Sequence, residues 1–432
     1  MARHAHTTAR PGPPLWPIAA GAVVVVAAAG GLYLGATSST GTDSLTTAAA
    51  TSAAPTTTTP AASPSPEPEP VSFTLVTAGD VLPHTTVNKD AQLADGTWDY
   101  VPEMEPMRAY IEGADIALCH LEVPFAPEGE AITAYPVFGA PADLATSLKA
   151  IGWDGCSNAS NHSLDKGREG LEYTIDVLDA AGLGHAGTGS TAAEAAAAQL
   201  YEVSRDGQSF VLAQISATTF HNDYTDPTQW SDVLSPLTDS ASIIASAKAA
   251  RAAGADIVVF TPQWGQEYWK EPDVLQQQLA SEIAASGEVD VILGGHPHVP
   301  QPMVKLDGGP DGEGMWVAYS QGNFLSNQDE ACCDISTSTG LIMEATIEVD
   351  GDDARVTNVT WSGSTVDTAG MQRVYPIQSL LDGAQPELLT LSADRIQSRW
   401  ESLVAIMGTD QYDPAAPPQT GGATVTVLPK EY

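Results

Sequence analysis

The sequence has little positive charge for its length. Its 432 residues include 17 Lys and Arg against 54 Asp and Glu, a formal net charge of −37, yet only 16% of the residues are charged. An average globular protein has about 25% charged residues, so the acidity reflects a shortage of bases. A field of this sign repels phosphate backbones, and no basic run offsets it. The composition argues against a nucleic-acid partner and favours divalent cations.

Cysteine is also scarce. The chain has four, Cys119, Cys156, Cys332 and Cys333, and no CxxC pair, so neither a zinc ribbon nor a thioredoxin motif is indicated. Cys119 and Cys156 lie near the ends of neighbouring predicted strands, and a disulfide between them would be permitted outside the cell. Cys332 and Cys333 could bond to each other or pair elsewhere.

A charge-free run near the amino terminus predicts a membrane anchor. Residues 15–36 contain no charged side chain, and as a helix they would extend about 33 Å, enough for a hydrocarbon core about 30 Å thick. Arg3 and Arg10 precede the run, which places residues 1–14 in the cytoplasm and the rest of the chain outside the cell membrane. A cleaved signal peptide is the alternative, although its apolar region would span only about 7–15 residues.

Residues 37–70 are predicted to form a disordered stalk. The segment is rich in Ser, Thr, Ala and Pro and ends in a Pro-Glu repeat, with too few large apolar side chains to offset the entropy of ordering. The Pro-Glu part should be stiff and extended. Two of the 17 bases and three of the 54 acids precede Val71, so nearly all the negative charge lies after the stalk.

From Val71 onward, short β-branched runs alternate with amphipathic stretches, which predicts an α/β domain over residues 71–375 with much parallel strand pairing. The predicted strands are 73–78, 116–121, 155–159, 210–215, 256–261, 289–293 and 316–319. The predicted helices are 102–112, 142–151, 168–181, 192–200, 240–253 and 273–286. Residues 341–349 and 354–361 flank an Asp-Gly-Asp turn and predict a hairpin. Residues 376–432 are expected to form a carboxyl-terminal helix, over 377–407, and a loose tail.

Side chains able to bind metal follow the ends of these strands. Open α/β sheets bind ligands just beyond the carboxyl ends of their strands, and oxygen and imidazole donors suit Mn, Zn or Fe. The strand-end residues are Asp80, His120, Glu122, Asn161, His162, Asp165, Gln263, Glu267, His296 and His298. The Gly-Gly-His-Pro-His segment predicts a bent turn that could present His296 and His298 to adjacent metals.

Six segments resemble, in order, those of the CapA-type proteins of capsule and poly-γ-glutamate synthesis, which are similar to the calcineurin-like metallophosphoesterases. The segments are AGDV at 78–81, HLEVP at 120–124, ASNHSLDKG at 159–167, QWGQEY at 263–268, GHPHV at 295–299 and YSQGNF at 319–324. Any one of them alone would be a weak signal, whereas six in order are specific. They cover most of the predicted domain.

The resemblance implies a four-layer α/β/β/α sandwich with one or two divalent ions, Mn, Zn, Fe or Mg, at one edge. The implied ligands are Asp80 and His298 for one metal, Asn161 and His296 for the other, and Glu122 between them. His162 would act as a general acid. Asp165 would either orient His162 or cap the following helix.

The chain departs from the family pattern at donor positions. Leu82 stands where the phosphoesterases have a histidine, and His84, two residues on, could substitute for it. Gln263 replaces a histidine and would offer a carbonyl oxygen as a weaker metal ligand. His120 stands where the relatives have asparagine. A weakened site, a single-metal site or a purely binding site therefore remains open.

Aromatic and polar residues beside these motifs are expected to line a ligand pocket. Trp264, Glu267 and Tyr268 follow Gln263 directly, and Asn323 belongs to the last motif. His84 and His120 are included in the same predicted pocket.

Three functions are compatible with the sequence. The first is a membrane-tethered protein for the synthesis or export of an anionic cell-surface polymer, poly-γ-glutamate or capsule, with the polymer or its membrane synthase as partner. The second is a secreted metal-dependent phosphoester or amide hydrolase. The third is a non-catalytic binding module that has lost its metal. The negative field would repel a polyanion beyond the site, which favours its release or passage.

Overall fold

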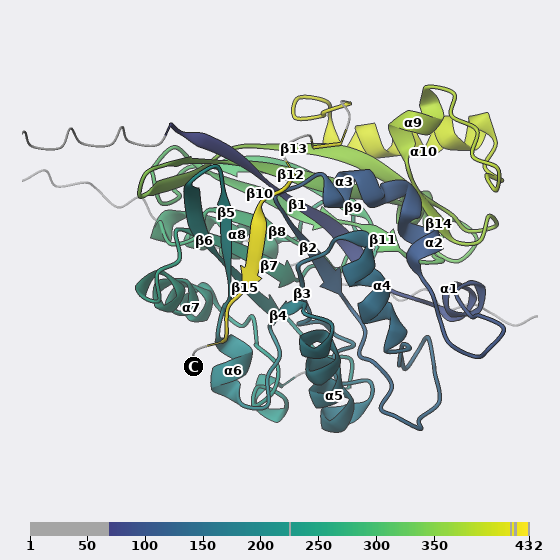
Figure 1. The fold of residues 1–432 in the computed structure, drawn as a ribbon, viewed down its shortest axis with the longest axis horizontal. Helices are drawn as coiled ribbons and strands as arrows, with labels where there is room; N and C mark the ends of the chain where they lie inside the picture. Colours follow the sequence, from purple (N-terminus) through teal and green to yellow (C-terminus); the bar gives the residue numbers. More distant parts are fainter. Residues whose placement is uncertain (1–68, 224–225, 415–416, 419–420, 431–432) are drawn as a thin grey trace, which may run out of the picture. The chain divides into compact units, whose positions relative to one another are not determined.

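Strands alternate with helices through most of the computed structural model, which describes residues 69–223, 226–414, 417–418 and 421–430 (Figure 1). The strands are β1 (Val71–Val81), β2 (Ile116–Leu121), β3 (Gly155–Ser157), β4 (Gly184–Ala186), β5 (Gln199–Arg205), β6 (Gln208–Thr218), β7 (Ile257–Gln263), β8 (Val291–Leu293), β9 (Pro300–Leu306), β10 (Met315–Gln321), β11 (Asn323–Leu325), β12 (Thr339–Asp350), β13 (Asp353–Asp367), β14 (Arg373–Pro376) and β15 (Thr424–Val427). The α-helices are α1 (Thr85–Asp90), α2 (Val101–Met104), α3 (Arg108–Glu112), α4 (Asp143–Ile151), α5 (Gly167–Ala180), α6 (Ala192–Ala196), α7 (Ser240–Ala252), α8 (Val274–Ser286), α9 (Ile377–Leu381) and α10 (Ala393–Met407). Short 3-10 turns are η1 (Glu105–Met107), η2 (Pro227–Gln229) and η3 (Ile335–Ser338).

Two β-sheets organise these elements. The first has the strand order β14-β13-β12-β1-β2-β3-β4, with β11 also paired to β1, and the second has the order β15-β5-β6-β7-β8-β10-β9. Strands β1 to β4 are parallel in the first sheet, and β6, β7, β8 and β10 are parallel in the second. The carboxyl ends of the parallel strands therefore meet at one edge of each sheet, which is where ligands bind in such folds.

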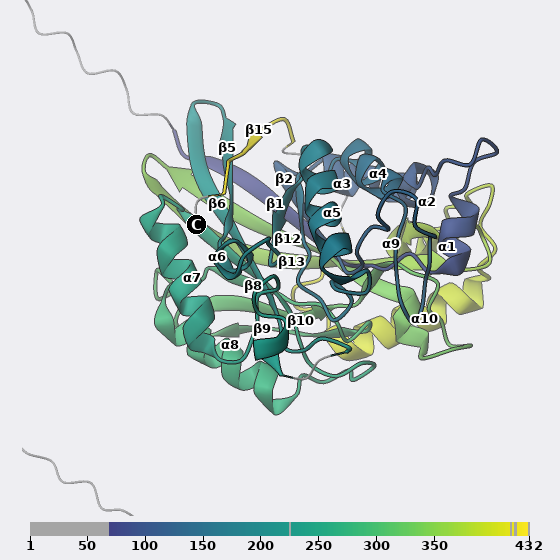
Figure 2. The same cartoon turned by 90° about the horizontal axis from the view of Figure 1, so that it is seen from below.

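The alternation of side chains along each strand divides the core into layers. In β7, Ile257 and Val259 join the apolar cluster that lies between the sheets, whereas Val258 and Phe260 join the cluster that includes residues of α7 and α8. A strand buried on both faces reads as a continuous apolar run because successive side chains point to opposite faces. Figure 2 shows α4 and α5 outside one sheet and α7 and α8 outside the other. The predicted mixed α/β class with two sheets is confirmed.

Proline and edge strands account for the main differences from the predicted elements. The predicted helix over 102–112 is divided into α2, η1 and α3 around Pro106, which cannot donate a helical hydrogen bond. The predicted helix over 192–200 was wrong after Ala196, because β5 begins at Gln199. The single helix expected over 377–407 is two helices, α9 and α10. The tail contains β15, which pairs with β5 at the edge of the second sheet.

The predicted hairpin and both candidate disulfides are present. Strands β12 and β13 pair from Asp350 opposite Asp353 across the turn. Cys119 and Cys156 lie opposite each other on β2 and β3 and are bonded, with their Cα atoms 4.4 Å apart. Cys332 and Cys333 are bonded to each other.

The predicted cytoplasmic tail at 1–14, the anchor at 15–36 and nearly all of the stalk at 37–70 lie outside the described residues. Among the residues that the structure describes, no helix is both long enough and apolar enough to span a bilayer.

Candidate metal centre

The strand ends of both sheets bring the predicted ligands together. Asp80 lies at the end of β1 and Glu122 directly follows β2, both in the first sheet. His296 and His298 follow β8 in the second sheet. Glu122, His296 and His298 each offer a ligand atom, and these atoms all lie within 4.8 Å of one another. The described part of the chain thus contains a buried His/Glu group that could hold a metal ion.

The turn that carries the two histidines is tightly constrained, as the Gly-Gly-His-Pro-His segment predicted. His296 and His298 both have positive φ values, 94° and 59°. Residues other than glycine rarely adopt this region of backbone conformation. Gly295 is required for a different reason, because a Cβ atom there would lie 2.6 Å from Oδ1 of Asp80. The backbone of this turn is therefore packed directly against the carboxylate, and both imidazoles are buried.

The orientation of the His298 ring follows from its neighbours. Asn323 donates its amide hydrogens to Gln328 and to the carbonyl of Thr337. These two bonds fix the direction of the amide, and its Oδ1, which can only accept, faces His298. Nδ1 of His298 lies 3.1 Å from that oxygen and 3.0 Å from Oδ2 of Asp80, so Nδ1 carries a proton. In a neutral ring, Nε2 then presents its lone pair 3.7 Å from Oε1 of Glu122.

Several buried polar atoms at this point have no hydrogen-bond partner among the described residues. They are Oδ1 of Asp80, both carboxylate oxygens of Glu122 and Nε2 of His120. Asp80 and Glu122 are fully buried. Leaving a buried charge without a partner costs roughly several kcal/mol. The Glu122 carboxylate and the imidazoles of His296 and His298, beside the unpaired Oδ1 of Asp80, form a suitable donor set for Mn, Zn or Fe. The residues fit a divalent cation.

The pKa shifts at the site point the same way. Burial lowers the pKa of His298, but Glu122 and Asp80 outweigh burial and raise it to about 10. Burial raises the pKa of Glu122 well above its ordinary value. Burial also lowers the pKa of His296 and of His120. Together the buried carboxylates require one positive charge near His298, which a proton or a metal cation can supply.

Gln263 does not present its carbonyl oxygen to this centre. Its Oε1 accepts a hydrogen bond from Oγ1 of Thr218 at 2.8 Å. Its Nε2 faces Oδ1 of Asn161 at 2.6 Å and Nδ1 of His296 at 2.8 Å. The structure thus turns the amide nitrogen of Gln263, and not its carbonyl oxygen, toward Asn161 and His296, and metal binding by Gln263 stays a prediction.

His162 and Asp165 form a hydrogen-bonded pair beside the centre. Nδ1 of His162 donates to Oδ2 of Asp165 at 2.6 Å, and the same oxygen accepts from the backbone N–H of Phe138 at 2.7 Å. Helix α5 has Lys166 at its N-cap and no side-chain capping bond. Of the two predicted roles for Asp165, the contacts therefore fit the orientation of His162.

Asn222 belongs to the same group and was missed from sequence. Its Nδ2 lies 3.2 Å and 3.4 Å from the two ring nitrogens of His162, and its Oδ1 accepts from Asn161 at 3.0 Å. The signal for it was the length of β6. The strand runs to Thr218 and not to 215, which makes the loop that contains Asn222 a strand-end loop.

A cavity of about 360 Å³ opens beside the centre. His84, Glu267 and Tyr268 line it, as predicted from sequence, and so do His162 and His298. Burial lowers the pKa of His84 to about 4, so this ring is neutral near pH 7. Burial and then Glu267 raise the pKa of Tyr268 to about 12, so its hydroxyl stays protonated.

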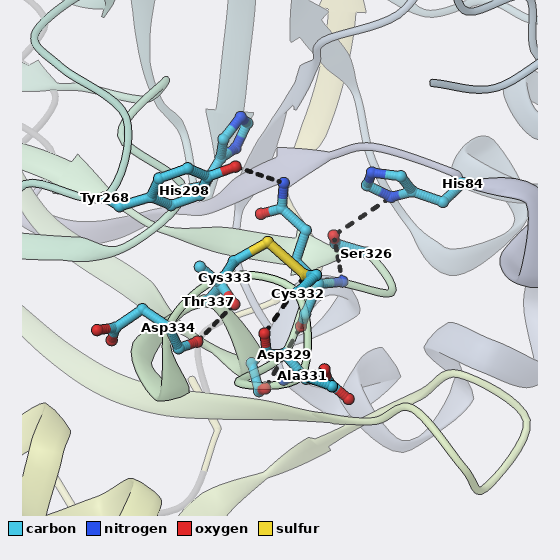
Figure 3. The surroundings of a disulfide bond; sticks show 12 residues. His84, Tyr268, His298, Ser326, Asp329, Ala331, Cys332, Cys333, Asp334 and Thr337 are labelled. Atoms are coloured by element: carbon cyan, nitrogen blue, oxygen red, sulfur yellow. Dashed lines mark hydrogen bonds between the residues drawn. A yellow bond between two sulfur atoms is a disulfide. The ribbon is translucent and has the colours of Figure 1, made fainter. Parts of the chain in front are cut away.

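The vicinal disulfide forms another part of the cavity wall. Figure 3 shows the Cys332–Cys333 bond near Tyr268, His298 and His84. Sequence spacing allowed this bond but gave no sign that it would lie at the site.

Three predicted pocket residues lie elsewhere. Trp264 was predicted to line the cavity, but it is fully buried in the core of the second sheet, where its Nε1 donates to the carbonyl of Tyr319 at 2.8 Å. The prediction failed because Trp264 turns toward α8 and away from the cavity. His120 and Asn323 lie beneath the metal-binding group, where His120 contacts Ser157 and Asn323 contacts His298.

This combination defines a class of protein: a two-sheet α/β fold whose parallel strand ends converge on a buried carboxylate and histidine group. The model of the family described as "Bacterial capsule synthesis protein PGA_cap" matches residues 74–328, and the chain belongs to this family. The matched range contains every predicted site residue.

Two of its relatives carry the name CapA. The chain is 28% identical over 181 residues to the "PGA biosynthesis protein CapA" of Bacillus subtilis, covering 42% of this chain and 44% of that protein. It is 26% identical over 282 residues to the "Capsule biosynthesis protein CapA" of Bacillus anthracis, covering 62% and 63%. A protein of Sinorhizobium fredii, y4sH, is 33% identical over 141 residues, covering 31% and 28%. The chain thus spans between about a quarter and two thirds of the length of these relatives.

A solved structure shows a fainter likeness. The calcineurin-like phosphoesterase YfkN of Bacillus subtilis is 14% identical, with a TM-score of 0.43, and the match covers 78% of this chain and 99% of that chain.

Proposed function

We propose that the chain acts in the synthesis or export of an anionic cell-surface polymer, poly-γ-glutamate or capsule, through a divalent metal centre at Asp80, Glu122 and His298. The observation that carries the proposal is the group of buried acceptors, unpaired among the described residues, at the strand ends of a domain of the capsule synthesis family. The relatives named for capsule and PGA biosynthesis support the polymer as the class of substrate.

The chemistry of the site suits a reaction at an oxygen-bearing anionic group. A bound divalent cation would supply Lewis-acid polarisation of a carbonyl or phosphoryl oxygen. The described residues that line the cavity include no Lys or Arg, so the cation would be the main partner for the negative charge of a substrate. The cation thus accounts for how an acidic protein binds an acidic substrate at one point.

The His162–Asp165 pair supports a chemical role for the site in addition to binding. Asp165 fixes the ring so that Nδ1 carries a proton, and His162 lines the cavity beside His298. A histidine held this way can deliver a proton from Nε2, once it is protonated, to a departing oxygen or nitrogen atom. This pair is also the observation that favours the second candidate function, a phosphoester or amide hydrolase.

Membrane tethering is part of the same proposal. The charge-free run at residues 15–36 and the Pro-rich segment after it support a single-pass anchor, with its amino terminus in the cytoplasm and the domain outside the cell membrane. In this arrangement the domain would stand near a membrane synthase, which we propose as its protein partner.

Complementation tests the proposal. A strain from which the gene has been deleted is supplied with the full chain, with Glu122→Gln or with Glu128→Gln, and its surface polymer is quantified. Glu128 is exposed and makes a matched control for the loss of one carboxylate. The full chain and Glu128→Gln should restore the polymer, whereas Glu122→Gln should not, at equal protein levels. Full rescue by Glu122→Gln would contradict a chemical role for the centre.

A further inference from the structure

The carboxamide of Gln263 stands between two side chains that could serve a second cation. Its Nε2 is 2.6 Å from Oδ1 of Asn161 and 2.8 Å from Nδ1 of His296. All three side chains are at least 99% buried. A single amide nitrogen therefore meets both donor atoms that a cation at this position would have to bind.

The orientation of that amide follows from a chain of hydrogen bonds that starts at a carboxylate. Oδ2 of Asp165 can only accept, so Nδ1 of His162 donates to it. Nδ2 of Asn222 lies 3.2 Å from Nδ1 and 3.4 Å from Nε2 of this ring, and in the neutral ring only Nε2 can accept from it, because Nδ1 gives its hydrogen to Asp165. This turns Oδ1 of Asn222 toward Asn161, whose Nδ2 donates to it at 3.0 Å.

The same chain continues to Gln263 and ends at Thr218. Because Asn161 gives its Nδ2 to Asn222, its Oδ1 faces Gln263 and requires a donor, which is Nε2 of Gln263. The opposite atom of the amide, Oε1, accepts from Oγ1 of Thr218 at 2.8 Å. The second hydrogen on Nε2 is then directed at Nδ1 of His296. In this orientation the oxygen and both hydrogens of the Gln263 amide have partners.

The two candidate cation positions differ in whether their metal-donor atoms already have hydrogen-bond partners. At the first, Oδ1 of Asp80 and both oxygens of Glu122 have no hydrogen-bond partner among the described residues. At the second, Oδ1 of Asn161 and Nδ1 of His296 each have one. A neutral His296 that accepts from the amide at Nδ1 has no lone pair left on that atom for a second metal.

We propose that the amide of Gln263 takes the place of a second cation, so that the centre holds one divalent ion, bound by Asp80, Glu122 and His298. This inference rests on the proposed function, because it assumes that the centre binds a cation at all. It assigns Gln263 a role as the residue that determines the metal stoichiometry, in place of the role of a weak ligand.

Metal titration tests the inference. The full chain, purified in detergent and stripped with a chelator, is titrated with Mn²⁺ and with Zn²⁺ in a calorimeter, and bound metal is measured by elemental analysis after desalting. The wild-type chain should bind one equivalent. Gln263→His removes the amide and adds an imidazole, and it should bind two. Gln266→His adds a histidine at an exposed position three residues away and should stay at one.

Variants of the ligands keep the test decisive if Gln263→His fails to fold. The single equivalent should survive Asn161→Ala and disappear in Glu122→Gln. A wild-type chain that binds two equivalents, one of which is lost in Asn161→Ala, would overturn the inference and leave the proposed metal centre standing. A folded wild-type chain that binds neither metal would instead overturn the proposed function.

Discussion

Buried acidic side chains serve two different purposes in this protein, and the contrast between Glu122 and Glu103 shows it. Both are buried, and each has at least one carboxylate oxygen without a hydrogen-bond partner among the described residues. Glu122 lies with Asp80 and two histidines, where a cation can compensate it. Glu103 has no histidine or second ligand of a described metal-binding group beside it. The cost of burying its charge therefore falls only on the free energy of folding.

Glu103 should therefore make folding dependent on pH. Burial raises its pKa from 4.5 to about 7, so between these values the folded chain retains a proton that the unfolded chain has lost. The stability contribution of Glu103 is present below about pH 4.5, falls as pH rises through about 7, and stays low above that. Glu103→Gln should raise the free energy of unfolding by about 1–3 kcal/mol at pH 8 and change it little at pH 4. Denaturant unfolding at both pH values measures this, and an equal effect at both would contradict it.

The role of His162 can be separated from metal binding by the choice of substrate. If His162 is a general acid, His162→Gln should lower kcat by about 10²-fold or more for an aryl phosphate with a poor leaving group, such as phenyl phosphate. The loss should be much smaller for nitrophenyl phosphate, whose leaving group needs little protonation. Asp165→Asn should follow the same pattern, and both variants should keep their metal. An equal loss on the two substrates would argue for a structural role.

Among the elements, the long strands could be predicted from sequence and the short ones could not. Strands β1, β2, β6, β7, β10, β12 and β13 were predictable because each is a run of apolar residues buried on one or both faces. Strand β4 has three residues and shows no periodicity, so it was missed. The edge strand β15 was missed because it pairs Thr424 with Ser204, which lie far apart in the sequence, and no local pattern encodes such a pairing. Strand β5 was missed because its first residues were assigned to the predicted helix over 192–200.

The candidate site was predictable in its membership but not in its contacts. Strand-end positions identified Asp80, Glu122, His296 and His298 because parallel strands end at a common edge. The direction of the Gln263 amide depends on Thr218, and the place of Trp264 depends on packing against Tyr319. Such contacts come from the tertiary fold, so sequence could name these residues without giving their roles.

The turn itself can be tested at Gly295. A Cβ atom at this position would lie 2.6 Å from Oδ1 of Asp80, so Gly295→Ala should displace the carboxylate. We expect metal affinity to fall by about 10–100-fold, the usual effect of disturbing a ligand's support. Calorimetric titration with Mn²⁺ measures the affinity, and the melting temperature of the metal-free chain serves as the control for folding. Unchanged affinity in a folded variant would show that Asp80 is not a ligand.

At the scale of the whole molecule, the charge of −37 and the metal centre act in opposite directions on a polyanion. The centre attracts one group of the polymer at short range, whereas the rest of the acidic chain repels the remainder. Salt screens the long-range term more strongly than a buried contact, because the Debye length is about 10 Å at 0.1 M ionic strength. The balance favours passage or release of the polymer over tight holding.

This balance predicts an unusual salt dependence. Binding of poly-γ-glutamate to the metal-loaded chain should become stronger as NaCl is raised from about 0.05 to about 0.3 M, because screening removes repulsion first. Sedimentation or light scattering with a polymer of defined length measures it. Binding that weakens steadily with salt would mean that attraction dominates, and it would contradict the proposed release of the polymer.

The most direct test of the central claim is anomalous diffraction from crystals of the chain grown or soaked with Mn²⁺ or Zn²⁺. We expect one anomalous peak, at about 2.0–2.3 Å from carboxylate oxygens of Asp80 and Glu122 and from Nε2 of His298. We also expect no second peak between Asn161 and His296, where the amide of Gln263 lies. Metal-loaded crystals with no peak at Asp80, Glu122 and His298 would contradict the claim that this family member works through a metal centre.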